Sequence, residues 1–231
     1  MEKLLYPLWK QEGVDADAFR QTLLEEVAPK LLSQQGVRAL RLNVVDSAVA
    51  AAESLRQATI TEPLDAMFSI WVDSANDRSA LDAAVAPACR EYAAYLVTES
   101  VPLVNDAPLG ERMPGWTQVV YLERPSGMSE ADWLSVWKGS HTSVAIETQS
   151  TFAYRQNVVT QRLSEGAVGI HAVVEESFPE AAMDSPMAFY DADSEDMLQA
   201  RVKAMIDSCA RFINFERINV VPTSEYLLKA L

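Results

Sequence analysis

The chain has 231 residues, 49% of them hydrophobic and 23% charged, which suits one large domain or two small ones with a sizeable core. Its formal net charge of -14, without a run of Lys or Arg, argues against a nucleic-acid or membrane partner. Cys89 and Cys209 are too few for a disulfide framework or a zinc motif. The segment MEKLLYPLWKQEG lacks the pattern of a signal peptide, and no run of about 18 apolar residues occurs. We therefore expect a cytoplasmic protein with reduced thiols.

The first half of the chain predicts elements in the order β-α-β-β-α-β. An apolar strand, LLYPLW at 4–9, precedes a helix whose apolar side chains recur at the helical period, at Phe19, Leu23, Val27 and Leu31. The remaining elements are expected as two strands, a helix and a closing strand, at 37–45, 66–73, 78–96 and 98–104.

The second half repeats this order after NDAPLGERMPG, a Pro- and Gly-rich segment at 105–115. A strand, QVVYLE at 118–123, precedes a helix that begins at a capping pattern, and its apolar stripe carries Trp133, Trp137 and His141. The remaining elements are again two strands, a helix and a closing strand, expected at 151–160, 168–175, 194–211 and 216–221.

Two short segments, RLNVV at 41–45 and RQNVV at 155–159, indicate an internal duplication with a shift of 114 positions. The same shift places Val27 on His141. Later segments pair with other shifts, so that Ser69 falls on His171 and Glu99 on Glu216. We interpret the chain as two copies of one module.

The predicted fold class is α+β, with tandem ferredoxin-like modules at 1–104 and 116–231 joined by a linker at 105–115. A four-stranded sheet with helices on one face leaves its other face bare. Two such sheets can cover each other within one chain, which gives a pseudo-dimeric α+β barrel. The alternative is two modules that only touch.

Three features resemble the EthD-like family of the dimeric α+β barrel superfamily. They are Trp137 and His141 as W-x-x-x-H on a helix, the strand DAMFSIWVDS at 65–74, and the closing segment SCARFINFERINVVPTSEYLL at 208–228. The resemblance spans nearly the whole chain, and related barrels include polyketide cyclases, dehydratases, cofactor-free monooxygenases and some haem enzymes. The helix His of this family falls on His141 and is replaced by Val27 in the first half. The resemblance thus implies one active site, in the second half, with the first half as a scaffold.

Both histidines are candidate catalytic residues. His141 is expected to face the sheet beside Trp137, where burial keeps the imidazole neutral and able to act as a general base or acid. The alternative is a core histidine with satisfied hydrogen bonds. His171 is expected on the third strand, on one face with Val173 and Glu175. It lines either the cavity of His141 or the interface between the sheets.

Aromatic side chains supply the candidate substrate-binding residues. Trp133 and Trp137 are expected to form apolar walls, and Tyr154 to orient the substrate. The loop at 176–196 carries many large apolar side chains, including Phe178 and Tyr190, and is either a lid over the cavity or a plug on the barrel end. Arg155 and Asn157 recur in the first half as Arg41 and Asn43, which favours a structural pairing between the halves.

No Gly-rich phosphate loop, GxSxG elbow or CxxC motif is present, so we expect neither a metal nor another cofactor. Haem bound through His141 or His171 is kept as an alternative. The predicted function is an enzyme acting on a small hydrophobic, aromatic or polyketide-like molecule, as a cyclase, dehydratase, other lyase or cofactor-free oxygenase. A protein that binds a hydrophobic metabolite without turnover is the rival, and a homo-oligomer is compatible with either.

Overall fold

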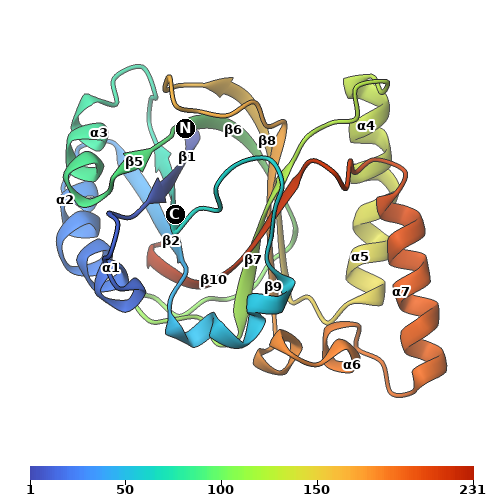
Figure 1. Cartoon of the computed structure of the whole chain (residues 1–231). Coiled ribbons are helices and arrows are strands. Elements are labelled where there is room, and N and C mark those ends of the chain that lie inside the picture. Colours follow the sequence, from blue (N-terminus) through green and yellow to red (C-terminus); the bar gives the residue numbers. More distant parts are fainter.

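Eight long strands form a closed antiparallel barrel in a computed structural model that describes residues 1–231 (Figure 1). They are paired in the order β2-β4-β1-β6-β8-β9-β7-β10, and β10 closes the barrel by pairing with β2. Short β3 (Gln57–Ala58) and β5 (Glu91–Tyr92) pair with β10 and β1. The long strands are β1 (Glu2–Trp9), β2 (Val37–Val44), β4 (Ala66–Val72), β6 (Tyr95–Leu103), β7 (Trp116–Leu122), β8 (Ala153–Arg162), β9 (Ala172–Phe178) and β10 (Ile218–Lys229).

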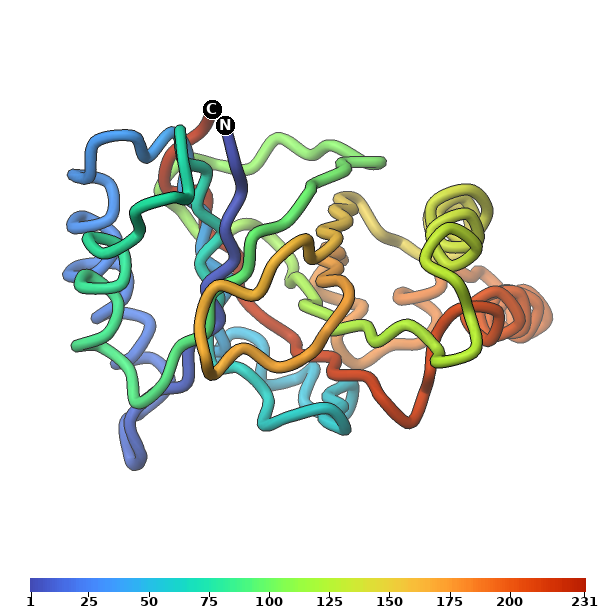
Figure 2. The backbone as a smooth tube through the Cα atoms, turned by 90° about the horizontal axis from the view of Figure 1, so that it is seen from above, coloured from blue at the N-terminus to red at the C-terminus, as the bar shows by residue number.

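The helices lie outside the barrel in two groups on opposite sides of it (Figure 2). The first group is α1 (Ala16–Thr22), π-helical η1 (Leu23–Val27), α2 (Ala28–Leu32), α3 (Ser79–Val85) and η3 (Ala86–Ala88). The second is α4 (Glu130–Val136), π-helical η4 (Trp137–His141), α5 (Thr142–Thr148) and α7 (Glu195–Cys209). Short η2 (Ser47–Leu55), η5 (Glu180–Met183) and α6 (Pro186–Phe189) complete the chain. None of these helices has the length and apolar character needed to cross a membrane.

The strand order is the same in both halves of the chain, β2-β4-β1-β6 in the first and β8-β9-β7-β10 in the second. The first helix of each half also contains a π-helical turn, at Leu23–Val27 and at Trp137–His141, again 114 positions apart. Two pairings, β6 with β8 and β10 with β2, join the halves into one barrel. The alternative of two modules that only touch is therefore wrong.

The barrel interior contains a buried ionic cluster. Lys3 Nζ lies 2.9 Å from a Glu99 oxygen and 3.1 Å from Glu175 Oε1, and Arg155 donates two hydrogen bonds to Glu225 at 2.9 and 3.1 Å. Both halves contribute to it, because Arg41 also pairs with Glu225 and Asn43 donates to Glu175, while Asn157 donates to Glu175 as well. The structural pairing predicted for the recurring Arg and Asn residues is confirmed.

Three cations face three carboxylates in this cluster, so its formal charges cancel. Burial alone would raise the pKa of Glu175, but the charges of Lys3, Arg155 and Arg41 outweigh burial and hold that pKa at about 2. Glu175 is therefore ionised at neutral pH although it is fully buried.

The sheet register corrects the later part of the predicted duplication. Leu5 pairs with Ser69 on β4, and the equivalent Val119 pairs with Glu175 on β9, so Ser69 matches Glu175 and not His171. In the same way Glu99 matches Glu225, because these residues lie opposite Asn157 and Asn43. Glu216 lies before β10, outside the barrel strands. Loops of unequal length shift the later strands by amounts that short segment similarities do not reveal.

The helix predicted over 78–96 is wrong beyond residue 88. The α-helical part ends at Val85, and a 3-10 turn follows. Pro87 lacks a backbone N–H and its ring clashes with the carbonyl four residues earlier, so it cannot continue an α-helix. The chain then forms β5 and enters β6 at Tyr95, earlier than predicted.

Replacing Arg155 by Met should lower the free energy of unfolding by about 3–5 kcal/mol, because it leaves Glu225 and Glu175 buried with one cation fewer. Urea unfolding monitored by circular dichroism measures this change. Arg38→Met is the control, since Arg38 pairs with Asp73 at the surface and such a pair contributes less than about 1 kcal/mol. Equal effects of the two substitutions would contradict the stabilising role of the cluster.

Candidate functional site

His141 is the last residue of the π-helical turn in the second half and faces the sheet, as predicted. The helix begins at Ser129, whose hydroxyl accepts a hydrogen bond from the Asp132 backbone N–H. Within the π turn, the hydroxyls of Ser140 and Thr142 donate to the carbonyls of Val136 and Trp137. π turns inside α-helices are rare and frequent at functional sites. The turn presents the imidazole to the space between helix and sheet.

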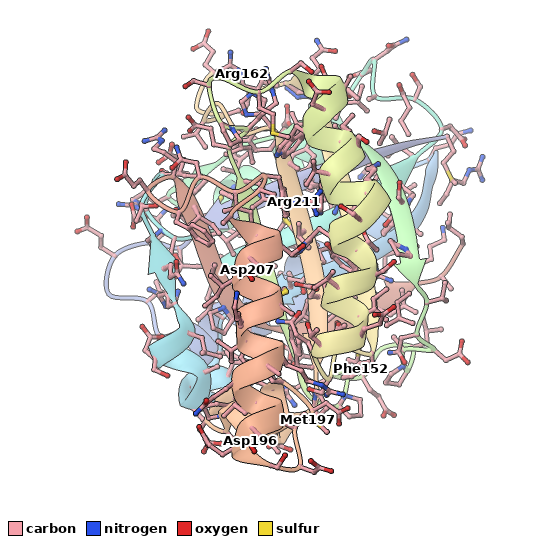
Figure 3. All side chains as sticks on the ribbon, turned by 90° about the vertical axis from the view of Figure 1, so that its right-hand side faces the viewer. Phe152, Arg162, Asp196, Met197, Asp207 and Arg211 are labelled. Carbon is pink, nitrogen blue, oxygen red and sulfur yellow. The ribbon has the colours of Figure 1, made fainter.

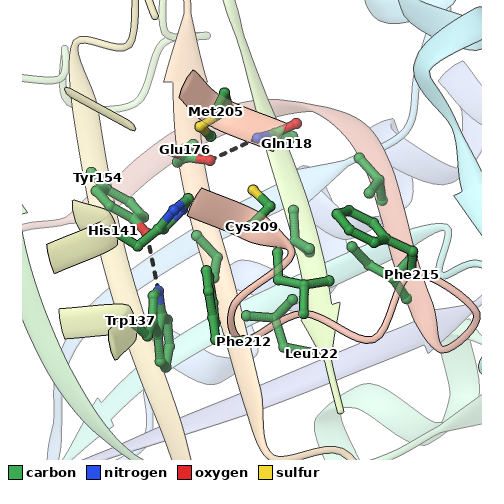
Figure 4. A pocket seen from close by; sticks show the side chains of 15 residues that line it. Gln118, Leu122, Trp137, His141, Tyr154, Glu176, Met205, Cys209, Phe212 and Phe215 are labelled. Atoms are coloured by element: carbon green, nitrogen blue, oxygen red, sulfur yellow. Dashed lines mark hydrogen bonds between the residues drawn. The ribbon is translucent and has the colours of Figure 1, made fainter. Parts of the chain in front are cut away.

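A cavity of about 140 Å³ lies between the outer face of the second half's sheet and the helices that cover it (Figure 4). Of its fifteen lining residues, twelve are hydrophobic. Helix α7 forms its outer wall beside α4 and α5 (Figure 3). The other three lining residues are Gln118, His141 and Glu176, and one of the twelve hydrophobic residues, Tyr154, carries a hydroxyl group.

Three of these polar side chains form a row across the sheet. Glu176 on β9 lies opposite Gln118 on β7 and opposite Tyr154 on β8. Gln118 Nε2 donates to Glu176 Oε2 at 2.7 Å, whereas Glu176 Oε1 has no hydrogen-bond partner. Only 5% of the Glu176 surface is exposed, and burial raises the pKa of its carboxyl to about 7. This carboxyl can therefore take up or release a proton near neutral pH.

Tyr154 presents a hydroxyl group in the same row. Trp137 Nε1 donates to the Tyr154 oxygen at 3.1 Å, so the hydroxyl accepts one hydrogen bond and keeps a proton that it can donate. Burial raises the pKa of Tyr154 far above its ordinary range, so the hydroxyl stays protonated. It can donate a hydrogen bond to an oxygen atom of a ligand in the cavity.

The imidazole of His141 is neutral at pH 7. Burial and the nearby positive charge of Arg211, just beyond the end of α7, lower its pKa to about 4 (Figure 3). Nδ1 lies 3.0 Å from Ser208 Oγ, and the Phe212 ring packs 4.6 Å from the imidazole. Because the Ser208 hydroxyl can donate or accept, Nε2 can act as either an acceptor or a donor toward the cavity.

The first half shows that this architecture does not need the polar groups. The positions of Gln118, Tyr154 and Glu176 are taken there by apolar residues, and so are those of His141 and Trp137. All five first-half residues are buried in its hydrophobic core: Leu4, Leu40, Ile70, Val27 and Leu23. A buried carboxyl oxygen without a hydrogen-bond partner is costly, so the row in the second half favours a role in binding or chemistry.

Glu176 was missed by the sequence prediction, because the third strand was expected to end at residue 175 and Glu176 was placed in a loop. The strand instead continues to Phe178. A signal was present: two adjacent acids, Glu175 and Glu176, follow an apolar run and must point to opposite faces if the strand continues.

His171 does not join this site. It precedes β9, its Nδ1 accepts the Arg124 backbone N–H at 3.1 Å, and its ring lies edge-on to Trp133 at 6.1 Å. The prediction that it shares a face with Val173 and Glu175 is wrong, since those side chains point into the barrel and the imidazole lies on the helical side. Strand alternation breaks where the chain enters β9. Among the imidazoles, His141 alone lines the cavity.

The predicted aromatic residues have different places. Trp137 lines the cavity, and Trp133 packs behind it at 5.1 Å, with its Nε1 donating to the Phe212 carbonyl. Phe178 and Tyr190 do not line the cavity, which corrects their predicted role in substrate binding.

The loop after β9 is a plug rather than a lid. Phe178 stacks on Trp116 at 5.2 Å and on Phe189 at 4.5 Å, in a cluster with residues of η2 and η5, and Tyr190 meets the Phe189 ring edge-on. Because β9 extends to Phe178, the loop leaves the sheet beyond the cavity.

The cavity beside His141 is too small for a haem. Drug-sized ligands occupy pockets of about 300–1,000 Å³, and the cavity of about 140 Å³ is smaller than that range. No three His, Cys, Asp or Glu side chains gather as a metal-binding group.

Mixing the purified protein with hemin should give the absorption spectrum of hemin in buffer, because His141 lies in a cavity too small for the ring. The measurement is a visible absorption titration. A sharp Soret band that is lost in His141→Ala would overturn this expectation.

Glu176→Gln should stabilise the fold in a pH-dependent manner. The pKa of this carboxyl is about 7 in the folded chain against an ordinary value of 4.5, so the folded state binds the proton more tightly and stability falls as pH rises through this window. By pH 8 the cost reaches about 3 kcal/mol, which the Gln side chain avoids. Thermal unfolding should show near-equal stability of the two proteins at pH 5 and a more stable variant at pH 8. A difference that does not change with pH would contradict the raised pKa.

The sequence matches no protein-family model and no curated protein. Among solved structures, an anthrone oxidase-like protein is similar over 100% of this chain and 96% of its own, with a TM-score of 0.57 and 11% identity. A putative monooxygenase from Lactobacillus acidophilus NCFM covers 100% and 97% (TM-score 0.50, 8% identity), and a variant of chlorite dismutase from Candidatus Nitrospira defluvii covers 97% and 90% (TM-score 0.50, 8% identity). These likenesses show the fold alone, an antiparallel barrel with helices packed on its outside.

Proposed function

We propose that the chain is an EthD-like barrel enzyme, built from two tandem ferredoxin-like modules, that moves a proton on a small hydrophobic molecule. The reaction is of the cyclase, dehydratase or other lyase type, or a cofactor-free oxygenation that begins with the same proton transfer. The observation that carries the proposal is the buried Glu176 carboxyl, which lines an apolar cavity and has one oxygen without a hydrogen-bond partner. Perturbed carboxyls in such cavities are candidate acid–base groups.

The proposal transfers the role of the base from His141 to Glu176. A base works best when its pKa lies near the operating pH, and the values are about 7 for Glu176 and about 4 for His141. His141 then serves as a neutral hydrogen-bonding partner for the ligand through Nε2. The single active site in the second half, and the scaffold role of the first, remain parts of the proposal.

A carbonyl compound illustrates the step. The ionised Glu176 carboxylate takes a proton from the carbon next to the carbonyl group, so the C–H bond breaks and an O–H bond forms on Glu176. The electron pair of the C–H bond forms a C=C bond to the carbonyl carbon, and the C=O π pair moves to the oxygen, which accepts a hydrogen bond from the Tyr154 hydroxyl. That donor stabilises the developing negative charge. The apolar walls, including Trp137, exclude water from the reacting atoms.

Exchange of the α-hydrogens of cyclohexanone for deuterium in D2O, followed by proton NMR, tests this function. The wild-type protein should accelerate exchange, and the rate should rise with pH through about 7 as Glu176 ionises. Glu176→Gln should lower the rate by at least about 100-fold, because general-base catalysis typically contributes about 10²–10⁴. Glu216→Gln removes an exposed carboxyl and should leave the rate unchanged.

A binding protein without turnover is the rival function. It predicts that cyclohexanone binds to the wild-type protein, seen by saturation-transfer NMR, while exchange proceeds at the rate in buffer. Equal exchange rates for the wild-type protein and the Glu176→Gln variant would likewise refute the enzymatic proposal.

A further inference from the structure

The floor of the cavity differs from the first half at two facing positions. Val120 on β7 lies opposite Val174 on β9, and both line the cavity. The equivalent pair in the first half is Tyr6 on β1 opposite Phe68 on β4, and both side chains are fully buried there. Two aromatic rings that fill the first half are thus absent from the second.

Larger side chains on the helix fill only part of the space that these two missing rings would occupy. Trp137 and His141 are larger than their first-half counterparts Leu23 and Val27, and they still leave the cavity of about 140 Å³. An engineered apolar cavity of about 150 Å³ in another protein binds benzene. The space above the two valines therefore has the size of one six-membered ring.

We propose that the ligand of this site is a single six-membered ring with one uncharged oxygen group, such as a phenol or a cyclic ketone, held over Val120 and Val174. The inference rests on the proposed function and narrows its substrate class from aromatic or polyketide-like molecules to single rings. The ligand ring occupies the place that the side-chain rings of Tyr6 and Phe68 occupy in the first half.

The polar side chains of the cavity determine which oxygen group the ligand carries. Glu176 lines the cavity and its Oε1 has no hydrogen-bond partner, so the carboxyl can accept from a phenol hydroxyl when ionised, or donate to a ketone when protonated. The Tyr154 hydroxyl, which accepts a hydrogen bond from Trp137, can donate its proton to the same ligand oxygen. In the first half the Tyr6 hydroxyl donates to Asp82 at 2.9 Å, so a phenol bonded to a carboxylate already occurs in this architecture.

The charge of the walls excludes anionic rings. No Lys or Arg lines the cavity, and its one ionisable side chain that carries a charge near neutral pH is the acid Glu176. A ligand carboxylate would be buried without a cation and beside a carboxyl, which is strongly unfavourable. Phe215, a lining residue between α7 and β10, is 51% exposed, so the cavity wall reaches the protein surface there (Figure 4).

Fluorine NMR titrations with 4-fluorophenol, 4-fluorobenzoate and 6-fluoro-2-naphthol test the proposal on the wild-type protein. 4-Fluorophenol should bind at least ten times more tightly than either of the other two, because benzoate adds a charge and naphthol adds a ring. Tighter or equal binding of the naphthol or the benzoate would overturn the proposed ligand class.

Val174→Phe supplies the matched variant, since it introduces the first half's own residue into the cavity. It should keep the far-ultraviolet circular dichroism of the wild type and weaken 4-fluorophenol binding at least ten-fold. Ile206→Phe adds the same ring on the surface of α7, where Ile206 is 54% exposed, and should not change binding. Unchanged binding in a folded Val174→Phe would refute the location. If that variant does not fold, the wild-type comparison of the three probes still decides the ligand class.

The two proposals fail in distinguishable ways. Tight binding of 4-fluorophenol without any exchange of cyclohexanone hydrogens would refute the enzymatic function and leave the ligand class standing. Catalysed exchange together with preferred binding of the two-ring probe would refute the ligand class and leave the proton transfer standing.

Discussion

Closure of the barrel buries both faces of most of its strands. The rest of the structure depends on how the side chains on each face are stabilised away from water. Inside the barrel, polar side chains are tolerated because cations and carboxylates are equal in number and hydrogen-bonded. Outside, the helices cover the sheet with apolar side chains. Glu175 and Glu176 are neighbours on β9 and face opposite sides of the sheet. Glu175 lies among cations inside the barrel and has a pKa of about 2, whereas Glu176 lies among apolar side chains outside it and has a pKa of about 7. Environments that separate the pKa values of two similar groups are a mark of acid–base sites.

The duplicated architecture provides its own comparison. In the first half, helix and sheet enclose a continuous apolar core that includes Leu4, Leu40 and Ile70. In the second half the same positions carry an amide, a phenol and a carboxyl beside a cavity. Cavities and unpartnered polar atoms lower stability, and proteins retain such costs mainly at functional sites. The apolar core of the first half therefore stabilises a chain in which the cavity and polar side chains of the second half are destabilising.

Much of this organisation could be predicted from the sequence. Hydrophobic periodicity gives the order of the elements. The RxNVV segments make His141 the equivalent of Val27, a position on the apolar stripe that faces the sheet. What could not be predicted depends on tertiary hydrogen bonds and loop lengths. The end of β9 is set by pairing with β7 and β8. Because of this pairing, Glu176 lies at the centre of the site and not in the predicted loop. Likewise the face of His171 is set by a backbone bend and the Arg124 N–H rather than by strand alternation.

The central claim is that Glu176 is a carboxyl kept near the midpoint of its titration by an apolar cavity. Carbon-13 NMR of the Glu side-chain carboxyls, with Glu176→Gln to assign the signal, measures this directly. The account predicts one glutamate resonance that titrates with a midpoint near pH 7 and is absent from the variant. A Glu176 signal that titrates near the ordinary value of 4.5 would contradict it.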